Sequence, residues 1–339
     1  MEFEPQSYTV KEITDISKTL KKEDEVVSIS VDVNGVNILL AHSPIQYRTK
    51  DGMSLLIRSK KPKDYTFLRY DLEGNQTVKA VIKDEYFNFR WAKFLPTNEI
   101  ILITSRCEYR DKNDFDKNAK VYNLKGELER DFTVGDGLND VRIDKKGNVW
   151  TSYFEEGIYG NYGWGVQELG VWTSYTDEDT DKNDIDGTPL GASGLVCWSN
   201  KGEKIWSFKP VEELDYISDS PSINIDDEDN TWLNYYIYFP HDHLEYPLVK
   251  LNSEKQMEFL KNGPIRSSSY NILGNKIVAA GYYFELFEIN GQNATKLKDI
   301  IFKSKEGIEL NKSYIKSFGS HIGFFKDQKI YLTNVSEVV

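Results

Sequence analysis

Apolar and polar residues alternate in short runs along the whole chain, and Gly or Asn residues separate the runs. The first such unit spans residues 26–42 and turns at Asn34-Gly35. A period of two is typical of strands, and Asn-Gly supplies the positive φ that tight hairpins need. The same unit recurs at residues 89–105, 141–153, 223–238, 268–282 and 314–325. The pattern therefore predicts an all-β protein built from repeated hairpins.

A second hairpin follows each of the first five units. These hairpins span residues 68–82, 120–132, 195–208, 248–259 and 285–300. Two hairpins make four antiparallel strands, which is one propeller blade. We therefore predict a single six-bladed β-propeller domain over residues 1–339. Its expected blades are 26–83, 84–134, 135–209, 210–262, 263–303 and 304–339 together with 8–13.

The sixth unit is one strand short, because only residues 329–339 follow its first hairpin. The missing strand is predicted at the other end of the chain. The segment from Thr9 to Ile13 reads T-V-K-E-I and resembles T-V-K-A-V at residues 77–81. We expect it to close the ring as the outer strand of the last blade, which covers an otherwise free strand edge.

Composition and charge narrow the range of partners. The 13% aromatic content favours strands, and the net charge of −12 argues against nucleic acid. The basic cluster at residues 58–63 is short and is interpreted as solvated surface.

The chain has no run of about 18 apolar residues, and its acidic start lacks the features of a signal peptide. Cys107 and Cys197 suit a reducing compartment, with one disulfide between them as the alternative. We expect a cytoplasmic monomer with no membrane partner.

The connections between second and third strands are long, at residues 43–52, 106–119, 155–193 and 240–246. In a propeller these connections open on one face, and long loops on a rigid scaffold often carry function. In the longest of them, Tyr159 and Trp164 are expected to form an apolar platform for a ligand. The alternative is a structural plug whose aromatic residues only pack over the channel.

Two polar segments are weak candidates for metal sites. Asp179 and Asp181 belong to an acidic run that resembles a calcium loop but lacks its bidentate Glu. His241 and His243 could share a metal ion if the backbone turns between them. Solvated loops account better for both segments, so we assign no cofactor and leave a divalent metal as the alternative.

The first strand of each blade lines the channel, so its first residues should lie at the channel mouth. Charges of both signs there suit a small polar ligand held by directional hydrogen bonds. The expected ligand-binding residues at the mouth are Arg90, Trp91, Asn139, Asp140, Asp219 and Arg266, with Glu25 nearby.

The run N-D-V-R-I-D-K-K-G-N-V-W at residues 139–150 resembles the six-bladed propellers of the NHL, gluconolactonase and virginiamycin B lyase type. Residues 225–232 repeat its second half, and residues 152–164 are similar to an insertion in bacterial propeller proteins of unassigned activity. The resemblance implies the fold, because the motif is a structural signature of a hairpin.

For function, the resemblance implies a divalent metal at the mouth, held in gluconolactonase-like enzymes by a Glu, an Asn and an Asp. Only Asn139 and Asp140 match that pattern. Glu25 lacks the Gly-Pro context, and the family's later Asp aligns with residues 220–222, which read S-P-S, with Asp219 just upstream. A virginiamycin-lyase-like reaction needs a His and Glu pair at the mouth, and no histidine begins a channel strand.

We therefore expect a binding module that captures a small polar molecule or a protein partner on the loop-bearing face. The alternative is a metal-dependent, lactonase-like hydrolase, so the sequence leaves open whether the protein is an enzyme.

Overall fold

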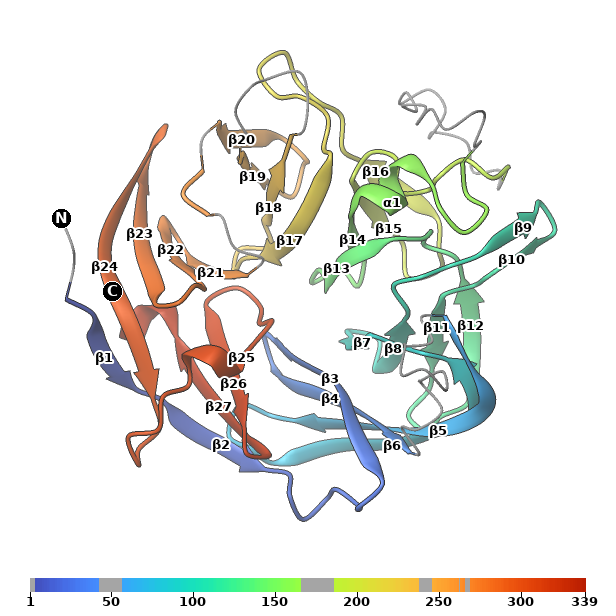
Figure 1. Cartoon of the computed structure of the whole chain (residues 1–339), viewed down its shortest axis with the longest axis horizontal. Coiled ribbons are helices and arrows are strands. Elements are labelled where there is room, and N and C mark those ends of the chain that lie inside the picture. The colour runs from blue at the N-terminus through green and yellow to red at the C-terminus, as the bar shows by residue number, and fades with distance from the viewer. Residues whose placement is uncertain (1–3, 43–56, 166–185, 238–245, 262, 266–268) are drawn as a thin grey trace.

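The computed structural model describes residues 4–42, 57–165, 186–237, 246–261, 263–265 and 269–339. The strands form six blades arranged around a central axis, each built from four antiparallel strands, and one blade carries a fifth, parallel strand at its edge (Figure 1). The predicted six-bladed β-propeller is therefore confirmed. Each blade places its first strand nearest the axis and its last strand at the rim.

The first three blades use strands in chain order, with one extra hairpin and one short helix in the connections. Blade 1 consists of β3 (Asp24–Asp32), β4 (Gly35–His42), β5 (Arg58–Tyr70) and β6 (Gln76–Phe87). Blade 2 consists of β7 (Trp91–Leu95), β8 (Glu99–Ile103), β11 (Ala119–Tyr122) and β12 (Leu128–Phe132). Blade 3 consists of β13 (Leu138–Ile143), β14 (Val149–Tyr153), β15 (Leu195–Trp198) and β16 (Lys204–Ser207). The extra elements are β9 (Tyr109–Asp111), β10 (Asp114–Phe115) and α1 (Glu155–Tyr159).

The last three blades follow the same plan. Blade 4 consists of β17 (Asp219–Ile225), β18 (Thr231–Tyr236), β19 (Leu248–Leu251) and β20 (Met257–Leu260). Blade 5 consists of β21 (Tyr270–Leu273), β22 (Lys276–Ala279), β23 (Phe284–Asn290) and β24 (Asn293–Lys303). Blade 6 takes β25 (Tyr314–Ile315), β26 (His321–Lys326) and β27 (Lys329–Asn334) from the C-terminal end. Two 3₁₀ turns, η2 (Asn311–Ser313) and η3 (Val335–Glu337), flank these strands.

The N-terminal segment closes the ring, as predicted, but with two strands rather than one. β2 (Lys11–Asp15) pairs antiparallel with β27 and is the outer strand of blade 6. Just before it, β1 (Gln6–Thr9) pairs parallel with β24 of blade 5. The buried Val10 joins the two strands and donates its backbone N–H to Lys303 O at 2.8 Å. The closing strand therefore begins two residues later than Thr9, because residues 6–9 cover the neighbouring blade.

The repeated I-D-x-x-x-N-x-W motif is a hairpin device in the structure. The Asp144 carboxylate accepts hydrogen bonds from the backbone N–H of Lys146 and Asn148 and from the Trp150 indole. Asp226 makes the matching bonds to Asn230 N and to the Trp232 indole in the next blade. The motif therefore specifies a turn and anchors a core tryptophan, in agreement with its interpretation as a structural signature.

Hydrophobic residues pack between neighbouring blades, and the largest buried cluster joins blades 2, 3 and 4. Both cysteines are buried free thiols, so Cys107 and Cys197 form no disulfide. Among the described residues, no helix is long and apolar enough to cross a membrane.

In the basic cluster at residues 58–63, Arg58, Lys60 and Lys61 are exposed, but Lys63, on the long strand β5, is not. The Lys63 ammonium is buried and donates to Asn88 Oδ1 at 2.7 Å and to Ser59 Oγ at 2.8 Å. Burial lowers the pKa of Lys63 to about 8. The expectation of solvated surface is therefore wrong for this lysine, which its neighbours hold inside blade 1.

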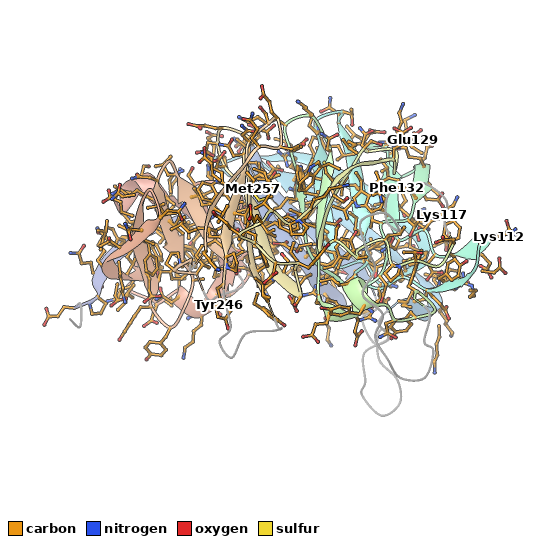
Figure 2. The ribbon with its side chains drawn as sticks, turned by 90° about the horizontal axis from the view of Figure 1, so that it is seen from above. Lys112, Lys117, Glu129, Phe132, Tyr246 and Met257 are labelled. Carbon is orange, nitrogen blue, oxygen red and sulfur yellow. The ribbon has the colours of Figure 1, made fainter. Side chains whose placement is uncertain are left out.

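The two faces of the ring differ in the connections that they carry. Glu129 and Met257 belong to the outer hairpins and lie toward one face, whereas Tyr246, from a connection between second and third strands, lies toward the other (Figure 2). On the Tyr246 side, the described parts of two long connections contact each other, since Tyr109 N donates to Tyr162 O at 2.8 Å.

Candidate functional site

Polar and charged side chains from the first strands meet across the axis of the ring. Lys316 follows β25 in blade 6, and its Nζ lies 3.4 Å from Oδ2 of Asp140 on β13 in blade 3. Blades 3 and 6 are opposite one another in a ring of six, so this ion pair spans the channel (Figure 1). The remaining polar residues of this channel cluster are Ser30 on β3, Lys93 on β7, Arg142 on β13, Asn224 on β17 and Asn271 on β21.

Asp140 is the anion at the centre of the cluster. Its carboxylate is fully buried, and Nη2 of Arg142 lies 3.3 Å from Oδ2. The backbone N–H of Val141 also donates to Oδ1 at 2.9 Å. Burial disfavours the ionised carboxylate, yet Arg142, Lys316 and Lys93 together hold the pKa of Asp140 below its ordinary value. Asp140 is therefore the counter-ion of three cationic side chains.

Lys93 is the cation of the cluster whose charge is least offset by nearby negative groups. Its side chain is buried, and among the described residues it has no hydrogen-bond or ion-pair partner. Burial, and then the nearby positive charge of Arg142, lower the pKa of Lys93 to about 7, although Asp140 and Asp32 act in the opposite direction. The nearby Asp32 is already paired with Arg69. The ammonium form of Lys93 would thus be stabilised by an additional anion.

The channel cluster therefore holds three cationic side chains around one carboxylate. Such an excess of buried positive charge attracts a small anion, because unpaired charges are costly away from water. Asp140 was predicted from the sequence, whereas Lys93, Arg142 and Lys316 were not. Two of the three could have been predicted, because Lys93 and Arg142 are charged residues inside strands that were expected to line the channel.

Asn139 and Asp219 are brought together at the start of their strands, apart from Asp140. Asn139 Nδ2 donates to Asp219 Oδ1 at 3.0 Å. The Tyr236 hydroxyl lies 3.2 Å from both Asp219 Oδ2 and Glu155 Oε1. Burial raises the pKa of Asp219 to about 6, opposed by the hydrogen bond from Tyr236. This mouth cluster combines hydrogen-bond donors and acceptors from blades 3 and 4.

Arg90 and Trp91 have different environments. Arg90 is exposed, its guanidinium lies 5.1 Å from the centre of the Trp91 ring, and its charge contributes to the lowered pKa of the half-buried Lys316. Trp91 itself is only 7% exposed and packs in the core. Arg90 is thus accessible to a ligand, whereas Trp91 mainly supports it. Arg266, Asp179, Asp181, His241 and His243 lie outside the described residues.

The described residues do not fit the divalent metal that the family resemblance implies. Two cations already compensate Asp140, and they would repel a metal ion there. Glu25 is exposed at the start of β3. In the part of the chain that the structure describes, no group of three or more His, Cys, Asp or Glu side chains is placed to hold a metal ion.

The first part of the 155–193 insertion packs against blade 2 rather than forming an open platform. Trp164 is 3% exposed, its indole donates to Cys107 O at 2.8 Å, and its ring lies 5.0 Å from Tyr109. Arg106 joins the packing, with Nη2 2.9 Å from Asp136 Oδ2. Tyr159 is half-buried against the core. Trp164 thus presents almost no surface to a ligand and packs against the connection between β8 and β11 of blade 2.

We therefore expect Trp164→Ala to destabilise the fold by roughly 3 kcal/mol, the usual cost of truncating a buried aromatic residue. Urea unfolding followed by fluorescence measures the change. Tyr282→Ala is the control, since Tyr282 is 77% exposed and its loss should cost less than about 0.5 kcal/mol. A Trp164→Ala protein as stable as the parent would contradict the packing role.

The chain has distant structural neighbours among solved proteins. No protein-family model matches the chain. No curated protein matches it either. The β-propeller domain of the Trilobed protease from Pyrococcus furiosus is 12% identical, with a TM-score of 0.43 over 93% of this chain and 82% of that domain. The extracellular domain of BT4673 from B. thetaiotaomicron is 11% identical (TM-score 0.40), and the match covers 97% of this chain but only 42% of that domain. The gluconolactonase XC5397 from Xanthomonas campestris is 7% identical (TM-score 0.38), with 92% and 95% of the two chains covered. The sheet topology makes the chain a six-bladed β-propeller, and its structural neighbours include gluconolactonases and other microbial propeller proteins.

Proposed function

We propose that the protein is a binding module that captures a small anionic ligand, a carboxylate or a phosphate, at the mouth of its central channel. The observation that carries the proposal is the excess of cationic side chains, Lys93, Arg142 and Lys316, around the single carboxylate of Asp140. An oxyanion at this place would supply the missing negative charge and accept hydrogen bonds from the Lys93 ammonium.

The rim of the channel suits the same ligand. The exposed Arg90 adds a positive charge near Lys316 and attracts anions toward the mouth. Asn139 and Tyr236 provide uncharged polar groups for directional hydrogen bonds. The anion thus accounts for the polarity of both the rim and the buried cluster. The metal-dependent hydrolase is the weaker candidate, because the Asp140 environment disfavours a cation.

Thermal unfolding in the presence of inorganic phosphate or citrate tests the proposal, because a ligand that binds only the native state raises stability by mass action. Chloride at matched ionic strength is the control. We expect a stabilisation by one of the two oxyanions that Lys93→Met abolishes, whereas Lys125→Met on an exposed turn keeps it. Equal stabilisation of parent and Lys93→Met would overturn the proposal, as would a stoichiometric divalent ion in the purified protein.

The affinity for the anion should also depend on pH. The pKa of Lys93 is about 7 without ligand, and an adjacent anion favours the ammonium form and raises that pKa. The affinity should therefore fall by roughly tenfold or more between about pH 7 and pH 9, as the free protein loses the Lys93 proton. Calorimetry in two buffers of different ionisation enthalpy should detect proton uptake on binding near pH 8. A pH-independent affinity, with no proton uptake, would contradict this role of Lys93.

A further inference from the structure

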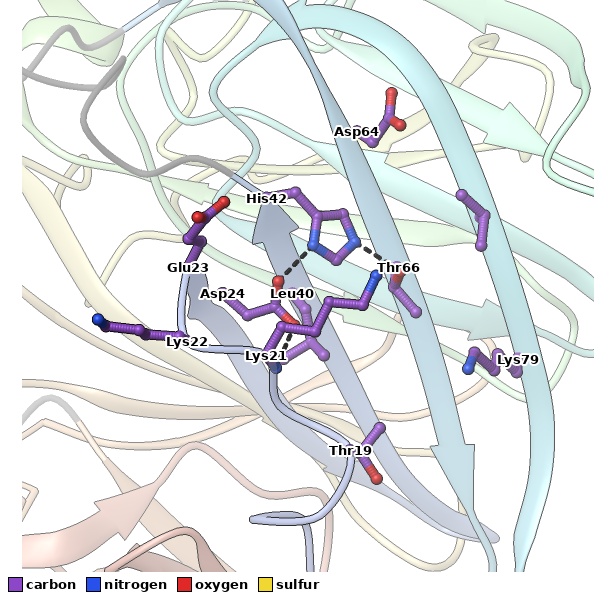
Figure 3. Close-up of a pocket in the computed structure, with 11 residues that line it drawn as sticks. Thr19, Lys21, Lys22, Glu23, Asp24, Leu40, His42, Asp64, Thr66 and Lys79 are labelled. Atoms are coloured by element: carbon purple, nitrogen blue, oxygen red, sulfur yellow. Dashed lines mark hydrogen bonds and ion pairs between the residues drawn. The ribbon is translucent and has the colours of Figure 1, made fainter.

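A pocket lies on blade 1, apart from the channel cluster. In it, hydrogen bonds join the side chains of Asp24, His42 and Thr66 in a row, and we call these three residues the relay. The pocket has a volume of about 610 Å³ and is lined by the four strands of blade 1 together with the segment at residues 19–23 that leads into β3. His42 at the end of β4 stands between Asp24 on β3 and Thr66 on β5 (Figure 3). The sequence analysis assigned no role to any of these three residues.

The distances in the relay match those of a nucleophile with its base. Nδ1 of His42 is 2.5 Å from Asp24 Oδ1, and Nε2 is 2.8 Å from Thr66 Oγ1. An ionised carboxylate only accepts hydrogen bonds, so Asp24 keeps the proton of the neutral ring on Nδ1. Nε2 then accepts the hydrogen bond from the Thr66 hydroxyl. A hydroxyl, a base within hydrogen-bond reach and a group that orients the base are the three parts of an activated nucleophile.

The backbone holds the three side chains in register. Asp24 is the cross-strand partner of His42, and Thr66 is the partner of Leu40, two residues before His42 on the same face of the blade. The carboxylate of Asp24 is also fixed from the opposite side, because Lys21 N donates to Oδ2 at 2.8 Å. The Asp24 side chain is 3% exposed, whereas the His42 side chain, which lines the pocket, is 26% exposed. A buried orienting carboxylate and an accessible imidazole are what proton transfer to a bound molecule needs.

Cationic side chains complete the pocket. Lys21 and Lys79 line it together with Thr66, and Figure 3 shows Lys21 extended in the direction of Thr66. An ammonium group near the nucleophile can stabilise the negative oxygen that forms when a hydroxyl adds to a carbonyl. Glu23 and Asp64 are the other acidic groups of the lining.

We propose that this pocket is a nucleophilic site at which Thr66, with His42 as its base and Asp24 as its positioning residue, cleaves small carboxylic esters. Thr66 Oγ1 adds to the ester carbonyl while its proton passes to His42 Nε2. The bond from the carbonyl carbon to the alcohol oxygen breaks, the alcohol leaves with that proton, and an acyl-threonine ester remains. Water, deprotonated by His42, then releases the carboxylic acid and restores the Thr66 hydroxyl. The net reaction is ester plus water giving acid plus alcohol.

Hydrolysis of p-nitrophenyl acetate by the full chain, with the acetylated residue mapped by peptide mass spectrometry after an acid quench, tests the proposal. We expect the acetyl group on Thr66, and a loss of at least roughly 100-fold in turnover for Thr66→Val and for Asp24→Asn. Thr66→Ser keeps a hydroxyl and should remain active, and Lys125→Met on an exposed turn should match the parent.

The controls separate the site from surface chemistry and from misfolding. Acetyl groups only on Lys21 or Lys79, or hydrolysis by Thr66→Val at the parental rate, would overturn the proposal. If Thr66→Val fails to fold, the Thr66→Ser variant decides, because an active site must acetylate its position 66. Absence of acetylation there in folded Thr66→Ser would equally refute the assignment.

Discussion

Replacing Asp140 with asparagine should lower the free energy of unfolding by about 3–5 kcal/mol, the usual cost of removing one partner from a buried ion pair. The change keeps the size of the side chain but removes the counter-ion of Arg142, Lys316 and Lys93. These cations would then repel one another in a place from which water is largely excluded. Equilibrium unfolding in urea near pH 7 measures the loss.

The matched control is Asp131→Asn, which removes a carboxylate from a surface pair with Lys117. Exposed pairs contribute at most about 1 kcal/mol, so this variant should resemble the parent. Adding Lys93→Met to Asp140→Asn should recover part of the lost stability, because the less compensated ammonium is then gone. If Asp140→Asn and Asp131→Asn cost the same, Asp140 is not the counter-ion of the channel cluster.

Removing residues 1–15 should destabilise the protein by on the order of 5 kcal/mol and cause it to associate. The deletion strips β1 from β24 and β2 from β27, and it removes the buried Val10 between them. Lost hydrogen bonds and lost apolar burial both contribute to the cost, and two uncovered strand edges then invite pairing with another chain. Thermal unfolding and light scattering after gel filtration measure the two effects.

A series of deletions separates the contributions of the two strands. Removing residues 1–5 leaves both strands and should have no effect on melting, whereas removing residues 1–10 takes away β1 and Val10 alone. We expect an intermediate loss of thermal stability for the 1–10 deletion, and the full loss of stability only when β2 is also removed. A protein lacking residues 1–15 that melts like the parent and stays monomeric would show that the ring does not depend on this closure.

The blades could be predicted because their information is local. A strand shows its half-buried surface through alternation, and a tight hairpin requires residues that accept positive φ, such as Asn98, Asp229 and Gly274. The pairing of the N-terminal strand is not local, and only the similarity of T-V-K-E-I to other outer strands indicated it. The sequence could not show that residues 6–9 would cover blade 5 as well.

The candidate sites were less accessible to sequence reasoning, because their residues are far apart in the chain. Trp164 looked like an exposed loop aromatic, and only the packing of the insertion on Tyr109 and Cys107 places it inside. Lys93 resembled an ordinary polar position of an alternating strand. His42 had no neighbouring motif, since its partners Asp24 and Thr66 lie 18 and 24 residues away.

By itself, then, the sequence determined that this chain folds into repeated four-stranded blades, and that its two ends meet in one of them. Hydrophobic periodicity and turn chemistry act over a few residues, so they can be read without knowing the final structure. Only the tertiary structure decided which charges share a space. Closing the ring brings Asp140 within 3.4 Å of Lys316, 176 positions later in the chain, and buries Asp140 beside Arg142. Electrostatic energies depend on distance and burial, and the order of residues along a strand specifies neither.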